Sequence, residues 1–208
     1  MSIRHLVAVA VVACAFAVPV HAQDAVKGLL DKASDSALDK LSKPGAFSAD
    51  DAIRIAMPGV GKNLGGLMKL TDKAGLTNDI SGSLNHAAEQ AAAEAKPIFR
   101  SAIDKMSLKD MGQIATGGKT AATDYLKKSS SGDIIKKLTP LVRSALEKAG
   151  VFKQTQTLSS VGYDDKKITD YVSQKTSDGI FTYMGREEEK ARGDPLGTGK
   201  AILKGLGR

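Results

Sequence analysis

The chain has 208 residues, which is enough for one domain with a substantial core. It contains no tryptophan, five phenylalanines and four tyrosines, and because strands are enriched in aromatic and β-branched residues, this composition favours packed helices over a sheet. A single cysteine excludes an intramolecular disulfide framework, and the formal net charge of +7 permits contact with an anionic surface or an acidic partner.

The N-terminus has the layout of a secretory signal peptide. Arg4 precedes an apolar run from Leu6 to Val18, and small or tolerated residues lead to a cleavage position after Ala22. The run is shorter than a membrane-spanning helix requires. We therefore expect a periplasmic or secreted protein. The alternative is a lipoprotein processed at Cys14, although the residues after Cys14 remain apolar.

Apolar residues at helical spacing continue after this segment. The first predicted helix runs from Asp24 to Lys43 and ends at Pro44-Gly45. A second helix is predicted after Ser48, with two aspartates in its first turn, and it stops before Pro58. A short, glycine-rich helix is expected within residues 61–75.

The segment 83–126 predicts several consecutive helices with marked ends. An alanine-rich helix leads to Pro97, which either opens a new helix or kinks a continuous one. Ser107 has the spacing of a capping box for a short helix that stops at Gly117-Gly118. Thr120 is placed to cap a further helix, which ends at the sequence SSSG.

The remaining segments complete an all-α prediction. An amphipathic helix over 131–150 contains Pro140, which predicts a kink, and a polar connection over 151–162 leads to a helix over 164–193. We expect a compact multi-helix domain of seven to nine helices, several of them short, without a significant sheet. The expected division is a signal peptide at 1–22, an N-terminal helix and linker at 23–46, and one helical domain at 47–208.

No motif indicates a catalytic, cofactor or metal site. Gly117–Thr120 (GGKT) resembles the end of a phosphate-binding loop, but Gln113 stands where that motif requires glycine, and a helix precedes it. After signal cleavage His86 is the only histidine and no cysteine remains, which disfavours a metal site and a Ser-His-Asp triad. Glu187–Glu189 could act as acids or bases if burial separated their pKa values, but neighbouring basic residues indicate helix-surface ion pairs.

Several short motifs occur in the order found in a known family. They are Ile53–Pro58, Leu84–Glu89, Ala95–Phe99, Met106–Asp110, Gly117–Tyr125, Asp170–Val172, Asp178–Phe181 and Glu187-Glu188. Through them the chain resembles the bacterial domain of unknown function family 4197, over roughly residues 24–208. The resemblance implies an exported, predominantly helical envelope protein, and it implies no activity and no catalytic residues. Gly112 and the glycine-rich C-terminal end depart from the family pattern.

Three functions remain open. The first is a non-enzymatic periplasmic module that binds an envelope protein or a small apolar ligand between its helices. The second is peripheral binding to an anionic membrane surface through the basic segment 96–153, which requires one shared face for Lys127, Lys128, Lys136, Lys137 and Lys153. The third is a hydrolase that uses carboxylates such as Glu89, Asp110 or Glu187. Nucleic acid is not an expected partner.

The placement of one set of polar motif residues would distinguish a functional site from a structural signature. Convergence of these side chains on one cleft would indicate a site, whereas separate capping and packing bonds would indicate a structural role. The set comprises Asn85, Glu89, Asp110, Thr123, Tyr125, Tyr171 and Glu187.

Overall fold

The computed structural model describes residues 20–57, 76–107, 114, 117–156 and 164–193. Within these residues there are six helices and no strand: α1 (Val20–Leu41), α3 (Leu76–Ala93), α4 (Lys96–Asp104), α6 (Ala121–Lys148), α7 (Val151–Thr155) and α8 (Asp165–Gly193). The all-α class is therefore confirmed for the described residues, and the predicted number of seven to nine helices is not.

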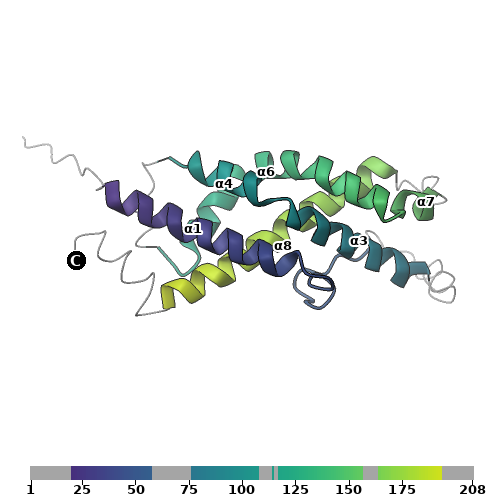
Figure 1. The fold of residues 1–208 in the computed structure, drawn as a ribbon, viewed down its shortest axis with the longest axis horizontal. Coiled ribbons are helices and arrows are strands. Elements are labelled where there is room, and N and C mark those ends of the chain that lie inside the picture. The colour runs from purple at the N-terminus through teal and green to yellow at the C-terminus, as the bar shows by residue number, and fades with distance from the viewer. Residues whose placement is uncertain (1–19, 58–75, 108–113, 115–116, 157–163, 194–208) are drawn as a thin grey trace, which may run out of the picture.

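The helix α8 runs obliquely across the molecule with α1 and α6 beside it (Figure 1). The helices α6 and α8 have 28 and 29 residues, so each is about 42 Å long at 1.5 Å per residue. They lie antiparallel, because Glu188 near the end of α8 accepts hydrogen bonds from Ala122 and Thr123 at the start of α6. This central pair positions the features described below.

Small and aliphatic side chains fill the core between these helices. Four alanines of α3 are buried, and their size allows neighbouring helices to approach closely: Ala87, Ala88, Ala91 and Ala92. The rings of Phe99 and Phe181 meet edge to face, with centroids 5.5 Å apart. Val26, Leu30 and other residues of α1 belong to the same core, so the N-terminal helix packs on the rest of the described chain.

Proline and glycine mark the helix ends largely as predicted. Pro97 lies in the first turn of α4, so the first of its two predicted roles is confirmed. Gly150 ends α6 with a left-handed φ of 71° and leads into α7. The prediction of a polar connection over 151–162 is wrong at its start, because Val151 and Thr155 are buried on one face of α7.

The helices predicted before and after SSSG are one continuous helix, α6. Leu126 precedes this sequence and Ile134 and Leu138 follow it, and all three side chains are buried. Because packing supplies most of a helix's stability, it overrides the weak helix propensity of serine and glycine here. The hydroxyl of Ser129 donates to the carbonyl of Leu126 at 3.3 Å, within the same helix.

The predicted helix over 48–57 is not formed. Ile53, Ile55 and Met57 are buried and the residues between them are exposed, which is the alternation of an extended backbone. The side-chain amide of Asn85 accepts a hydrogen bond from the Ile55 N–H at 2.9 Å and donates one to the Ile55 carbonyl at 2.8 Å. These two bonds occupy backbone groups that a helix would need. The short helix expected within 61–75, and most of the one expected after Ser107, lie outside the described residues.

The ring of Phe47 packs directly on the backbone of α8 at Gly179. A Cβ atom at position 179 would lie 2.7 Å from Cε1 of Phe47, whose side chain is fully buried. Only glycine leaves room for this ring, which anchors the extended segment to the centre of the molecule.

We predict that Gly179→Ala destabilises the protein by about 1–3 kcal/mol, because the added methyl group overpacks the Phe47 contact. Gly132→Ala is the matched control. Gly132 lies in α6 with nothing within 4 Å of an added Cβ, so this change should stabilise the helix by about 1 kcal/mol. Urea unfolding measures both effects, and equal stabilisation by the two substitutions would contradict the packing argument.

Candidate functional site

Asn85 and Glu89 lie one turn apart on α3 and bind the backbone of the preceding segment. Besides its two bonds to Ile55, Asn85 donates to the carbonyl of Ser81 at 2.7 Å. Glu89 is buried and accepts the N–H of Phe47 at 3.1 Å. The exposed ring of His86 lies 3.6 Å from the Glu89 carboxylate. Asn85 and Glu89 therefore hold the segment 47–55 in place.

Tyr171 of α8 binds the same segment, because its hydroxyl donates to the carbonyl of Ala56 at 2.9 Å. Burial raises the pKa of Tyr171, so the hydroxyl keeps the proton that this bond uses. Asp110 lies outside the described residues. Asn85, Glu89 and Tyr171 thus bind neighbouring backbone groups of one irregular segment.

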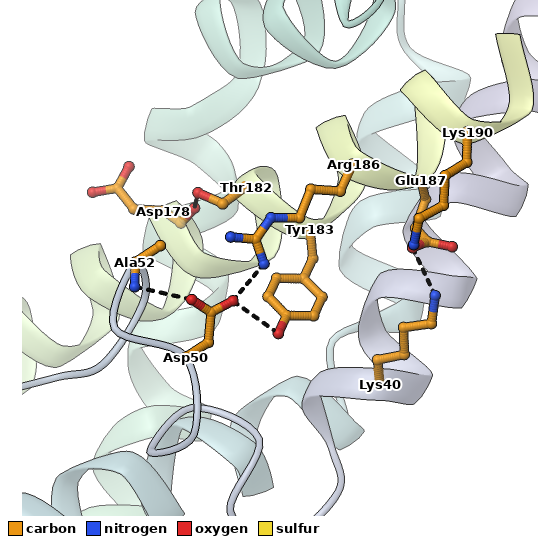
Figure 2. Close-up of polar contacts among 9 residues, drawn as sticks. All are labelled: Lys40, Asp50, Ala52, Asp178, Thr182, Tyr183, Arg186, Glu187 and Lys190. Atoms are coloured by element: carbon orange, nitrogen blue, oxygen red, sulfur yellow. Dashed lines mark hydrogen bonds and ion pairs between the residues drawn. The ribbon is translucent and has the colours of Figure 1, made fainter. Parts of the chain in front are cut away.

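Glu187 joins α8 to α1 (Figure 2). Its carboxylate accepts hydrogen bonds from Ser36 at 2.7 Å, from Lys40 at 2.6 Å and from Lys190 at 2.9 Å. Burial raises the pKa of Glu187, but the bonds from Lys40, Lys190 and Ser36 outweigh it and lower the pKa to about 2. With this pKa, Glu187 stays ionised near neutral pH. It can therefore form ion pairs but cannot serve as a general acid at that pH.

Asp50 reaches from the segment before Ile53 to two side chains of α8 (Figure 2). One oxygen accepts the N–H of Ala52 at 2.9 Å, and the other accepts the hydroxyl of Tyr183 at 3.1 Å and the guanidinium of Arg186. The Arg186 hydrogen bond and then the Ala52 N–H hold the pKa of Asp50 below its usual value. The guanidinium also lies over the Tyr183 ring, 4.8 Å from its centroid. Asp50 therefore anchors a loop to α8 and does not begin a helix.

Glu188 is fully buried and caps α6 from another helix. Its two oxygens accept the N–H groups of Ala122 at 3.0 Å and Thr123 at 2.8 Å, in the first turn of α6. Arg192, one turn further along α8, donates to the same carboxylate at 2.7 Å and to the carbonyl of Ile114 at 3.1 Å. A carboxylate at this end also interacts favourably with the helix dipole. The predicted surface role of Glu188 is wrong.

The sequence contains a signal for this burial. Glu188 is four residues after Met184 and seven after Phe181, so it shares their buried helix face. Three consecutive glutamates conceal that spacing, because the flanking residues Glu187 and Glu189 lie on other faces. Glu189 is half-exposed and pairs with Lys119 at 2.7 Å.

The structure does not place the described members of the motif set in one cleft. Asn85, Glu89 and Tyr171 bind the segment 47–56, and Glu187 binds α1. Thr123 and Tyr125 line two different hollows beside α6. Glu89 and Glu187 bind different elements, so they do not form a carboxylate pair for hydrolysis.

The larger hollow is a cavity of about 450 Å³ between α4 and α6, called here the α4–α6 cavity. The apolar part of its wall consists of Ile98, Ala102, Met106 and Ile134. Hydroxyl groups come from Ser101, Ser107, Tyr125, Ser129 and Ser130, and charges come from Lys105, Asp133, Lys136 and Lys137. Apart from Tyr125, none of these residues belongs to the polar motif set, although Lys136 and Lys137 were predicted to contact an anionic surface.

Positive charge dominates the described wall of this cavity, where three lysines and one aspartate lie. Lys136 lies 3.8 Å from Asp133, and both side chains are more than four-fifths exposed, so this ion pair is weak. The amino group of Lys137 lies 3.5 Å from the hydroxyl of Ser101 across the cavity. The arrangement can hold a negatively charged group beside an apolar wall.

We predict that Glu188→Gln lowers the free energy of unfolding by about 3–5 kcal/mol, because it leaves Arg192 without its buried charge partner. The control is Glu189→Gln at the neighbouring position, which removes only a surface ion pair and should change stability by less than about 0.5 kcal/mol. Urea titration of the two variants gives the comparison. Similar effects at both positions would rule out the capping role assigned to Glu188.

A second prediction concerns the pH dependence that Glu187 causes. Its pKa is about 2 in the folded protein and 4.5 ordinarily, so the unfolded chain binds its proton at higher pH than the folded one. Stability from this group is complete above pH 4.5 and is lost as the pH falls toward 2. Glu187→Gln should lower stability by up to about 3 kcal/mol at pH 7 and converge with the parent near pH 2. A difference that is independent of pH would contradict this expectation.

Within the described part of the chain, no three His, Cys, Asp or Glu side chains are grouped to hold a metal ion.

Comparison with known proteins gives a family and no activity. Neither a curated protein nor a solved structure matches the chain. A family model described as a protein of unknown function, DUF4197, matches residues 19–206. The predicted resemblance is confirmed, and the chain belongs to the DUF4197 family.

Proposed function

We propose that this protein is an exported, non-enzymatic binding module of the bacterial envelope whose ligand is a small amphiphilic anion in the α4–α6 cavity. The single observation that carries the proposal is the combination of an apolar wall with three lysines around one hollow. Its volume of about 450 Å³ lies within the range of small-molecule sites.

The position of the charges supports an anionic ligand. Lys105 directly follows α4, and Lys136 and Lys137 lie on α6, so cations flank the cavity from both walls. A carboxylate or phosphate between them would interact with all three charges, and the serine hydroxyls would donate hydrogen bonds to it. Ile98 and Ile134 would contact a hydrocarbon part of the same molecule.

The chemistry of the wall supports binding over hydrolysis. General acid–base hydrolysis commonly uses two groups with separated pKa values. Among the described residues, Asp133 is the one carboxylate that lines the α4–α6 cavity, and its side chain is 83% exposed. Asp50, Glu187 and Glu188 are each engaged in hydrogen bonds with cationic side chains elsewhere.

Helical geometry gives less support to a membrane surface as the partner. At about 100° per residue, Lys127, Lys128, Lys136 and Lys137 point in directions of about 0°, 100°, 180° and 280° around α6. Lys127 also pairs with Asp178 of α8 at 2.9 Å. The lysines of α6 therefore do not present one face to a flat anionic surface. No helix among the described residues is long and apolar enough to cross a bilayer.

We predict that the purified protein binds decanoate with a stronger affinity than decanol, which has the same chain and no charge. The double variant Lys136→Gln/Lys137→Gln should weaken decanoate binding about tenfold or more, equivalent to at least about 1.4 kcal/mol. Lys128→Gln is the control, because this exposed lysine lies on α6 outside the cavity wall. Isothermal titration calorimetry measures each affinity.

Three further results would contradict the proposal. Equal binding of decanol and decanoate would remove the role of the lysines, and equal losses in the control and double variants would indicate non-specific charge attraction. Binding to anionic vesicles without any binding of decanoate would favour the membrane alternative. Filling the cavity with Ala102→Trp should abolish decanoate binding while leaving vesicle binding intact.

A further inference from the structure

A second hollow lies on another side of α6, between α6 and α8, and is called here the α6–α8 cleft. Its volume is about 270 Å³, and it shares no lining residue with the α4–α6 cavity. Thr123, Asp124 and Lys127 contribute from α6, and Arg186 and Glu189 contribute from α8. The cleft lies beside the end of α6 that Glu188 caps, so its walls are fixed relative to one another.

Thr123 supplies the observation that points to a ligand. Its side chain is only 2% exposed, and its Oγ1 atom has no hydrogen-bond partner among the residues that the structure describes. Its backbone N–H donates to Glu188 at 2.8 Å, which fixes the backbone of this residue beside the cleft. Buried hydroxyl groups without a partner are rare in folded proteins, and a molecule in the cleft would satisfy this one.

The charges around the cleft are balanced, unlike those of the α4–α6 cavity. Each wall carries one carboxylate and one cation three residues apart: Asp124 and Lys127 on α6, and Glu189 and Arg186 on α8. Three residues correspond to about 4.5 Å along a helix axis. Both walls therefore offer both signs of charge to a ligand that itself carries both.

Each of these four side chains already has a partner: Arg186 binds Asp50 in a part-buried contact, and the other three contacts are solvated. Lys127 pairs with Asp178 at 2.9 Å and Glu189 pairs with Lys119 at 2.7 Å, and all of these side chains are more than one-third exposed. Exposed pairs of this kind are weak, so they can share their charges with an incoming ligand. The hydroxyl of Thr120 donates to Asp124 at 2.8 Å at an exposed position.

The floor of the cleft favours a small molecule. Gly185 has no side chain there, and a Cβ atom at this position would lie 3.3 Å from Cγ2 of Thr120, so any larger residue would narrow the space. The ring of Phe181 is almost fully buried and gives an apolar surface without room for a long chain. We propose that the α6–α8 cleft binds a small zwitterion of the size of an amino acid or dipeptide, with one of its polar groups hydrogen-bonded to Thr123.

The test uses the dipeptide alanyl-alanine and NMR of protein labelled at the threonine methyl groups. Addition of millimolar dipeptide should shift the Thr123 methyl signal and leave Thr176 unchanged. Thr176 is a matched reference because its hydroxyl is also buried without a partner, but it does not line the cleft. N-acetyl-alanyl-alanine methylamide has the same backbone without charges, and it should not bind. Binding of this blocked dipeptide or of glucose in place of the zwitterion would overturn the proposal.

Three variants test the role of the hydroxyl. Thr123→Val removes it at nearly constant volume and should weaken binding of alanyl-alanine at least tenfold, whereas Thr123→Ser keeps it and should retain binding. Thr176→Val should leave the affinity unchanged. Thermal unfolding of each variant separates loss of binding from loss of folding. Equal affinities of the valine and serine variants at position 123, or absence of any dipeptide binding, would refute the site. Decanoate should not compete, so this result is independent of the proposal for the α4–α6 cavity.

Discussion

The buried carboxylate of Glu188 joins the two longest helices, and the α6–α8 cleft lies beside this link. It accepts two N–H groups at the start of α6 and the guanidinium of Arg192, so its desolvation is offset by three hydrogen bonds and a favourable helix dipole. The protein's own side chain thereby occupies the end of α6 where an external anion would otherwise be favoured. Both proposed ligands would instead contact side chains along α6.

The polar residues that identify the family mainly hold an irregular segment in place. Residues 47–57 form turns and an extended end, and Asn85, Glu89 and Tyr171 bind their backbone groups from two helices. An extended segment in a helical protein needs such partners because it cannot satisfy its own N–H and C=O groups. The two hollows also take residues from the motifs, such as Thr123 and Tyr125 of Gly117–Tyr125, but Lys136 and Lys137 lie outside them. The motifs therefore indicated a fold more clearly than a function.

Sequence patterns predicted those features that depend on local chemistry. The starts of α4 and α8 follow from Pro97 and from Asp164–Asp165, and the all-α class follows from the spacing of apolar residues. The segment 48–57 was predicted wrongly because its aspartates favour a helix start locally, while Asn85 and Arg186 bind it from a distance. Neither hollow could be predicted, because each requires the relative placement of two helices that only packing determines. The alternation of Ile53, Ile55 and Met57 was the one local sign of an extended segment.

Adjacent glutamates on α8 bind different neighbours, and this limits the insertions and deletions that α8 can accept. Glu187 contacts α1 and Glu188 contacts α6, because successive residues point about 100° apart around a helix. Gly179, two turns earlier, must also face Phe47. Inserting or deleting a single residue between Gly179 and Glu187 would rotate one set of contacts away from its partners. Length differences between homologues should therefore fall in the connections between helices, and this part of α8 should keep a constant length throughout the family.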